Sequence, residues 1–173
     1  MLIAMTQRLK LRTINADDAE FYLRLLNDPS YIKNINDKNI RTVEAAKISI
    51  STGPVASQEK NGFSLYLVIR KDDDNAIGIC GLIKRDALKN VDIGYAFLPE
   101  FGGQGYAMEA AKAVVVYAYE HLGLEKLVAI TSPYNRNSNN LLAKLGFTLE
   151  DVVILEGESK ETNLYSCSLP PEI

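Results

Sequence analysis

The chain has 173 residues, of which 47% are hydrophobic and 24% are charged, the balance of an ordinary globular protein with a substantial core. Its formal net charge of −3 argues against a broad nucleic-acid interface, which requires clustered positive charge. No apolar run approaches the roughly 20 residues that span a bilayer, and the first residues lack the basic leader of a signal peptide. We therefore expect a cytoplasmic protein that binds neither nucleic acid nor membrane.

The first part of the chain predicts a strand followed by two helices. Residues 8–14 alternate apolar and polar side chains, as a half-buried strand does. Asn15 then offers a helix N-cap, apolar residues follow at helical spacing, and Pro29 is expected to end this helix. A second short helix is expected from Thr42 to Ile50.

The remaining part of the chain predicts both strands and helices. In chain order we expect strands at residues 63–70, 76–84 and 91–98, a helix from about Gln104 to His121, a strand at 126–132, a helix at 137–145, and strands at 147–155 and 163–169. The turn residues 72–75 predict an antiparallel hairpin, whereas the long helix between two strands predicts a parallel crossover. Because repeats and linkers are absent from the sequence, we expect one domain over residues 1–173. Its class is α/β (α+β), with a mixed, mostly antiparallel sheet of six to seven strands and helices on both faces.

A glycine-rich turn between a strand and the long helix is the most informative segment. Such a turn leaves unpaired backbone N–H groups at the positive end of a helix, where phosphate oxygens bind. A dinucleotide fingerprint starting at Gly103 would need Gly or Ala where Met108 stands. A nucleotide-triphosphate loop would need Gly-Lys-Ser/Thr, which is absent. On the residues alone, a helix start whose glycines only permit tight packing remains open.

Residues 102–107, Gly-Gly-Gln-Gly-Tyr-Ala, resemble the acyl-CoA pyrophosphate loop of the GNAT superfamily of N-acetyltransferases. The pattern of that loop is Gln/Arg-x-x-Gly-x-Gly/Ala, and only its first position departs here. Two further segments resemble the RimJ/RimL-type branch, which acts on ribosomal-protein N-termini: residues 6–29, and residues 135–147 with Asn-x-x-Ser followed by Lys-x-Gly-Phe. The resemblance spans residues 6–169. It implies a GNAT-like sheet in which one parallel strand pair splays apart, and acetyl-CoA as the co-substrate, without a metal.

The resemblance also implies which residues contact acetyl-CoA. Phe97 and Leu98 would bind the donor through their backbone. Asn135 would hydrogen-bond the arm of coenzyme A, with a turn or cap residue as the alternative. The pyrophosphate would be held by the loop and helix start, at Gly103, Gln104, Gly105, Tyr106, Ala107 and Met108.

Two residues are candidates for the acid–base chemistry of acyl transfer. Asp92 stands where related enzymes often carry a catalytic Glu and could take the amine proton, and a solvated strand-end acid is the alternative. Ser138 could donate to the departing thiolate and contact the donor, and ordinary helix capping is the alternative. Many superfamily members carry a Tyr donor four residues further on, where this chain has Leu142.

The sequence therefore predicts an acetyl-CoA-dependent N-acetyltransferase whose acceptor is a primary amine, either a protein N-terminal α-amine or a small amine. Because no Cys lies near the loop, we expect direct transfer in a ternary complex rather than an acyl-enzyme. A non-catalytic acyl-CoA-binding sensor module is the alternative, and a dinucleotide oxidoreductase is a remote third. The expected assembly is a monomer or a homodimer.

Overall fold

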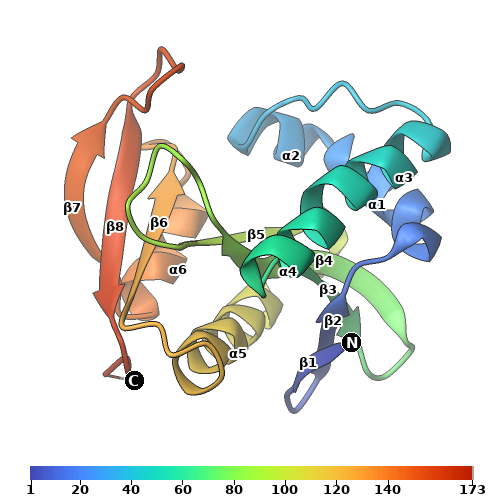
Figure 1. The fold of residues 1–173 in the computed structure, drawn as a ribbon, viewed down its shortest axis with the longest axis horizontal. Helices are drawn as coiled ribbons and strands as arrows, with labels where there is room; N and C mark the ends of the chain where they lie inside the picture. The colour runs from blue at the N-terminus through green and yellow to red at the C-terminus, as the bar shows by residue number, and fades with distance from the viewer. Residues whose placement is uncertain (173) are drawn as a thin grey trace.

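The structure, a computed structural model, describes residues 1–172, so Ile173, the last residue of the expected domain, lies outside the described residues. Within them the chain forms one sheet of eight strands, in the order β1-β2-β3-β4-β5-β6-β8-β7 (Figure 1). The strands are β1 (Leu2–Met5), β2 (Leu9–Thr13), β3 (Leu65–Arg70), β4 (Asn75–Ile83), β5 (Asp92–Phe97), β6 (Lys126–Thr131), β7 (Thr148–Val153) and β8 (Thr162–Ser168). Neighbouring strands are antiparallel except β5 and β6, which confirms the mixed, mostly antiparallel sheet.

The strand β1 is the one that the sequence does not predict, which is why six to seven strands become eight. Its four residues are too few to show an alternating pattern. They form a strand because they pair with β2, where Met5 lies opposite Lys10. The terminal ammonium group of Met1 donates to Thr13 Oγ1 at 2.7 Å, and the Thr13 N–H donates to the Met1 carbonyl at 2.9 Å.

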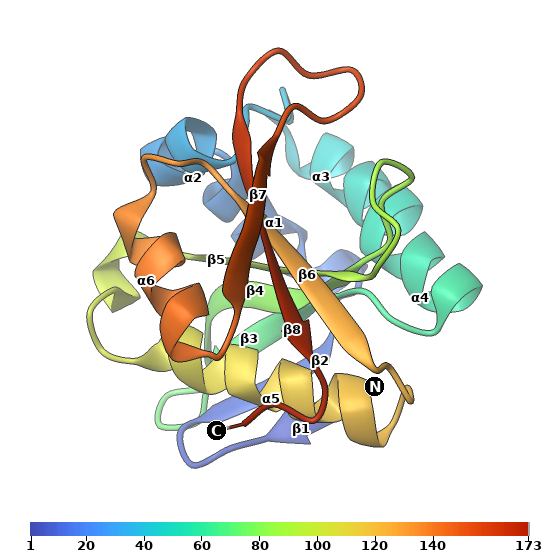
Figure 2. The same ribbon diagram turned by 90° about the vertical axis from the view of Figure 1, so that its left-hand side faces the viewer.

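The α-helices of the described chain lie on both faces of the sheet, as expected. They are α1 (Ala19–Leu26), α2 (Pro29–Asn34), α3 (Val43–Ile50), α4 (Ala56–Asn61), α5 (Tyr106–Glu120) and α6 (Arg136–Lys144). Figures 1 and 2 both show α5 on one side of the central strands and α2 and α3 on the other. One core joins Val114 of α5 to Leu127 of β6, and a second joins Leu25 of α1 and Ile50 of α3 to Leu67 of β3.

Pro29 has a further role besides the predicted one. The first helix does end before it, at Leu26, but Pro29 is also the first residue of α2. Asp28 caps this helix, because its Oδ1 accepts a hydrogen bond from the Ser30 N–H at 2.8 Å. Proline suits the first helical position, where an N–H has no intrahelical partner.

The helical region that begins at Thr42 extends beyond its expected end at Ile50. Thr42 Oγ1 caps α3 by accepting from the Ala45 N–H at 3.1 Å. The chain then continues through a π-helical turn at residues 51–55 into α4. Pro54 lies within this turn, and its missing N–H interrupts the ordinary α-helical bonding pattern.

The parallel pair β5 and β6 separates almost as soon as it forms. Its register contains one residue pair, Asp92 opposite Val128, and the Val128 N–H donates to the Val91 carbonyl at 2.9 Å. By comparison, β5 pairs with β4 along its whole length, from Asp92 to Phe97. We call the separation of β5 from β6 the β5–β6 split. It lies in the middle of the sheet and interrupts the hydrogen-bonded ladder there.

The chain shows no sign of a helical membrane anchor in the part that the structure describes. Among residues 1–172 we find no helix with both the length and the apolar character needed to cross a bilayer.

Candidate functional site

The glycine-rich loop leads into α5 with its backbone N–H groups uncapped. Gly103 and Gly105 adopt φ values of 71° and 81°, which favour glycine, and Gly105 is the N-cap residue of α5. The first helical hydrogen bond runs from the Glu109 N–H to the Gly105 carbonyl at 3.1 Å. Within residues 1–172, no acceptor is hydrogen-bonded to the backbone N–H groups of residues 103–108. Such a row of donors at a helix N-terminus is suited to phosphate oxygens.

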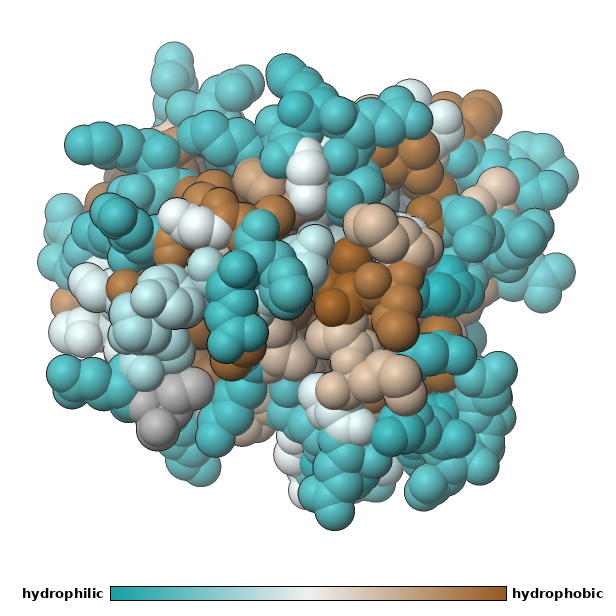
Figure 3. Space-filling view, turned by 60° about the horizontal axis from the view of Figure 1, so that its bottom comes forward, coloured by the Kyte–Doolittle hydropathy of each residue, from teal (hydrophilic) through white to brown (hydrophobic). Residues whose placement is uncertain are grey.

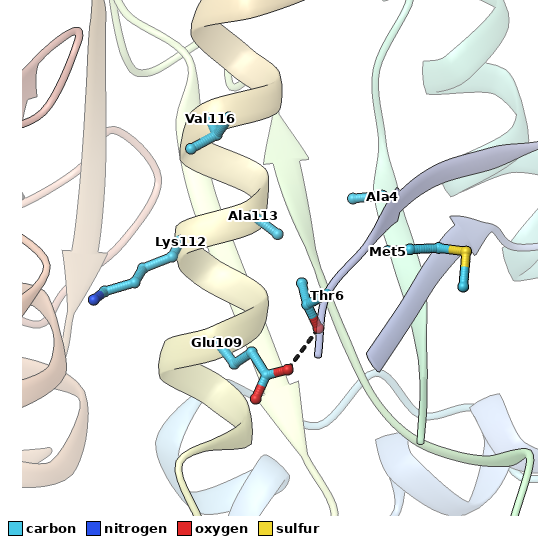
Figure 4. Close-up of a pocket in the computed structure, with 7 residues that line it drawn as sticks. All are labelled: Ala4, Met5, Thr6, Glu109, Lys112, Ala113 and Val116. Atoms are coloured by element: carbon cyan, nitrogen blue, oxygen red, sulfur yellow. Dashed lines mark hydrogen bonds between the residues drawn. The ribbon is translucent and has the colours of Figure 1, made fainter. Parts of the chain in front are cut away.

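The loop is held in place by two residues that the sequence did not single out, Arg8 and Glu109. Arg8 Nε lies 2.7 Å from Glu109 Oε2, and Arg8 Nη1 donates to the Gln104 carbonyl at 2.8 Å. The Arg8 guanidinium also lies over the ring of Tyr106, 4.4 Å from its centre. Thr6 Oγ1 donates to Glu109 Oε1 at 2.6 Å (Figure 4). These contacts join the turn between β1 and β2 to the start of α5, across about 100 residues of chain that carry no local signal of the pairing.

A shallow pocket lies beside the contacts of Arg8 and Thr6 with Glu109, which we call the Arg8–Glu109 brace. The pocket contains few groups that could take part in catalysis. Figure 4 shows its lining residues, which come from the start of the chain and from α5: Ala4, Met5, Thr6, Glu109, Lys112, Ala113 and Val116. In Figure 3, where the lower side of Figure 1 comes forward, apolar side chains gather among polar ones on this side of the molecule. The Glu109 carboxylate is already bonded to Thr6 and Arg8. We therefore place the candidate site at the β5–β6 split and the loop, not in this pocket.

The β5–β6 split exposes part of a central strand. Tyr95 and Phe97 are only half-buried although β5 lies in the middle of the sheet. The Leu98 N–H donates to the Ile77 carbonyl at 3.0 Å, so this group is directed toward β4 and away from the split. Because hydrogen-bonding direction alternates along a strand, the backbone of Phe97 is directed into the split instead. Of the two expected backbone contacts, Phe97 therefore has the better geometry to bind a donor.

On the α5 side of the split, Tyr95 contacts Ser138. The two hydroxyl oxygens lie 2.7 Å apart. Burial raises the pKa of Tyr95 to about 12, so its hydroxyl stays protonated at neutral pH and can donate to Ser138. Asn135 is the N-cap residue of α6, and its Oδ1 accepts from the Ser138 N–H at 3.3 Å. Asn135 therefore caps α6, and when Tyr95 donates to Ser138 the Ser138 O–H can donate to another group.

Asp92 is buried, so the alternative of a solvated strand-end acid is wrong. Its side chain is 1% exposed, and Oδ2 accepts from Arg85 Nε at 2.7 Å. Oδ1 is buried and has no hydrogen-bond partner in the described part of the chain. Burial raises the pKa of Asp92 to about 6, and the hydrogen bond and charge of Arg85, together with the nearby backbone N–H of Ile130, oppose this rise. A carboxylate with this pKa is mostly ionised at neutral pH and is able to accept a proton.

The two candidate groups lie on opposite faces of β5. Tyr95 and Phe97 pack with the core beneath α5, whereas Ala96 and Leu98 pack with the core beneath α1 and α3. Side chains alternate along a strand, so Asp92 lies on the face of Ala96 and Leu98. The split therefore has a carboxylate on one face and a pair of hydroxyl groups on the other.

Leu142 and the two cysteines have structural roles. Leu142 is fully buried in the core and offers no hydrogen-bond donor in place of a Tyr. Cys80 and Cys167 are free thiols and buried, and burial raises the pKa of both, so neither is suited to attack a thioester.

Similarity to known proteins extends over nearly the whole chain. Residues 8–148 match the family described as acetyltransferase (GNAT) domain. YoaA, an uncharacterised N-acetyltransferase of Bacillus subtilis (strain 168), is 32% identical over 98% of this chain and 98% of its own length. The ribosomal protein uS5-alanine N-acetyltransferase of Escherichia coli (strain K12) is 25% identical over 68% of this chain and 64% of its length. A RimL ribosomal-protein α-N-acetyltransferase, solved with coenzyme A, shares the fold with a TM-score of 0.83 at 17% identity, over 97% of this chain and 98% of that one.

Proposed function

The chain belongs to the GNAT family of acetyltransferases, and from this premise we propose that it transfers an acetyl group from acetyl-CoA directly to a primary amine in a ternary complex. The acceptor is a protein N-terminal α-amine or a small amine. In this proposal the described residues 1–172 belong to one N-acetyltransferase domain that acts in the cytoplasm. The observation that carries this function is the buried Asp92 carboxylate, whose Oδ1 has no partner within residues 1–172, beside the β5–β6 split.

Donor binding would use the loop and the open edge of β5. The unpaired N–H groups of residues 103–108 would hold the pyrophosphate, and the backbone of Phe97 would bind the pantetheine arm in the split. The half-buried state of Phe97 and Tyr95 supports this placement, because a ligand there would cover them. Asn135 would contact the arm while it caps α6.

Asp92 and Ser138 would divide the proton transfers between the two faces of the split. Asp92 Oδ1 would accept the proton of the acceptor amine, which must be neutral to attack the thioester. The Ser138 hydroxyl, held by Tyr95, would donate a hydrogen bond to the departing thiolate. A coenzyme A thiol has a pKa near 8.5 and leaves tolerably well unaided, so this contribution is moderate.

An α-amine suits this site better than a lysine side chain. The pKa of a peptide N-terminal α-amine is about 7.7–8.0 and that of lysine about 10.4, so at neutral pH more of this α-amine is already nucleophilic. The similarity to the uS5-alanine N-acetyltransferase of E. coli supports the same class of acceptor.

The function is tested by the release of free thiol from acetyl-CoA in the presence of candidate amines. The panel contains amino acids, N-terminal peptides, polyamines, aminoglycosides and peptides whose only amine is an internal lysine. We expect release with α-amines to exceed release with the lysine peptides. Binding of acetyl-CoA without turnover of any amine would favour a sensor module, and robust activity confined to internal lysines would contradict the α-amine preference.

A further inference from the structure

Arg85 holds the site carboxylate with only one of its donors. It lies in the connection between β4 and β5, and its Nε donates to Asp92 Oδ2 at 2.7 Å. A guanidinium carries five N–H donors in a planar fork. Within residues 1–172, its terminal nitrogens make no hydrogen bond. The Arg85 side chain is 40% exposed, whereas that of Asp92 is 1% exposed. The same side chain therefore contacts a buried group at one edge and is open to an incoming molecule at the other.

The surroundings of Arg85 place it on the face of the sheet where Asp92 lies. Figures 1 and 2 show the β4–β5 connection rising beside β6 on the side that carries α2 and α3. Tyr31 of α2 is buried, which raises the pKa of its hydroxyl to about 12, and the charge of Arg85 acts in the opposite direction. Arg85 contacts Asp92 and its charge reaches Tyr31 of α2, so it lies on the α2 side of β5, next to the carboxylate proposed to take the amine proton.

Charge balance at this pair limits which acceptors fit. Arg85 and Asp92 together are neutral, so an acceptor that arrives as an ammonium ion adds one uncompensated positive charge beside a buried carboxylate. An anionic group on the same acceptor, placed on the free N–H groups of Arg85, would restore neutrality and form charge-assisted hydrogen bonds. One guanidinium would then contact both the site carboxylate and the acceptor anion, which keeps the amine and the anion only a few bonds apart.

We infer that the acceptor is a small molecule of the amino-acid type, in which Asp92 faces the amine and Arg85 binds a carboxylate a few bonds away. Arg85 is then both a positioning residue for Asp92 and a specificity-determining residue for the substrate. This inference rests on the proposed function, because it names the acceptor class of the same site.

The test compares acceptors that differ only in the carboxylate. For several side chains, kcat/KM is measured by thiol release with the free amino acid, its carboxamide and the decarboxylated amine. These are measured for the natural protein, Arg85→Gln, Arg85→Lys and, as a matched control, Lys89→Gln, which removes an exposed positive charge from the same connection. The ratio of two acceptors within one enzyme cancels any damage to Asp92. Comparing that ratio between enzymes cancels the different amine pKa values of the acceptors.

We expect the preference for the free amino acid over the decarboxylated amine to fall about tenfold or more in Arg85→Gln, because a hydrogen bond between charged groups is lost. Arg85→Lys should keep part of the preference, and Lys89→Gln should keep all of it. An unchanged ratio in a folded Arg85→Gln protein overturns the inference. Faster acetylation of decarboxylated amines or of peptide α-amines by the natural protein overturns it without any variant and leaves the proposed function standing. If no amine is acetylated, the proposed function fails and this inference fails with it.

Discussion

At the scale of the residue, Asp92 connects burial with catalysis. Its pKa is raised to about 6 by burial, so the proton-accepting form is lost as the pH falls below that value. We expect kcat/KM to rise with pH through an apparent pKa near 6, followed by a second rise as the free amine forms. Asp92→Asn should lower kcat by roughly 100-fold and remove the first rise. Rate measurements between pH 5 and pH 9 check this, and a variant that keeps its rate at every pH would exclude Asp92 as the base.

Because its pKa is raised on folding, ionised Asp92 lowers the stability of the folded state. The folded state holds the Asp92 proton more tightly than the unfolded state, so the contribution of this group to stability falls as the pH rises from about 4 to about 6 and stays low above that. A change from 3.8 to about 6 corresponds to a free energy on the order of 3 kcal/mol. Asp92→Asn has no charge to bury. We therefore expect the melting temperature of the variant, relative to that of the natural protein, to increase between pH 4 and pH 7. A difference independent of pH would contradict the raised pKa.

Tyr95 and Ser138 form a second residue-scale unit. If the Tyr95 hydroxyl holds that of Ser138 toward the thiolate, Ser138→Ala and Tyr95→Phe should each lower kcat about tenfold and leave the KM for acetyl-CoA nearly unchanged. The double variant should be hardly worse than the poorer single one, because the two side chains act together. Tyr134→Phe is the matched control, since Tyr134 is 92% exposed next to α6. If the two reductions in kcat multiply in the double variant, Tyr95 and Ser138 act independently, which would contradict this interpretation.

At the scale of the element, donor binding by the glycine loop and the start of α5 can be tested by comparing one glycine inside the loop with one outside it. Gly103 and Gly123 have φ values of 71° and 65°, and a Cβ at either would meet no atom within 4 Å. Gly103→Val and Gly123→Val should therefore strain the backbone to a similar extent. Only the first would intrude where the pyrophosphate binds, and its affinity for acetyl-CoA should fall at least about tenfold, or about 1.4 kcal/mol. Calorimetric titration of both folded variants measures this, and equal affinities would remove the loop from the donor site.

The elements differ in how far the sequence predicts them. The strand, glycine turn and long helix between Val91 and His121 follow from local patterns, because turn glycines and helical periodicity are properties of neighbouring residues. The bond between Tyr95 and Ser138 joins residues 43 positions apart, and the brace from Arg8 to Glu109 joins residues 101 apart. No local pattern carries such contacts. The burial of Asp92 is hidden from the sequence for the same reason, since it depends on strands on both sides and on Arg85 from the preceding connection.

At the scale of the whole molecule, the sheet consists of two parts that one residue pair joins. β1 to β5 form one continuous ladder and β6 to β8 another, with Asp92 opposite Val128 between them. A donor bound in the split would contact both parts, so acetyl-CoA should stabilise the folded chain as a whole. At 100 times its dissociation constant the gain is about 2.7 kcal/mol, or a rise in melting temperature of roughly 5–10 °C. Thermal unfolding with and without acetyl-CoA tests this, and Gly103→Val should show a smaller rise than Gly123→Val at one ligand concentration.

The split has a consequence for how this protein responds to selection for heat resistance. A sheet gains hydrogen bonds when its ladder closes, so the simplest stabilising change would draw β6 onto the free edge of β5. That change would remove the room for the donor. Stabilising substitutions at Phe97 or Ile130, on the facing strands, should then lower catalytic activity, whereas those at core residues away from the split should not. In this molecule the backbone groups of β5 that face the split can either pair with β6 and add thermal stability or bind the donor.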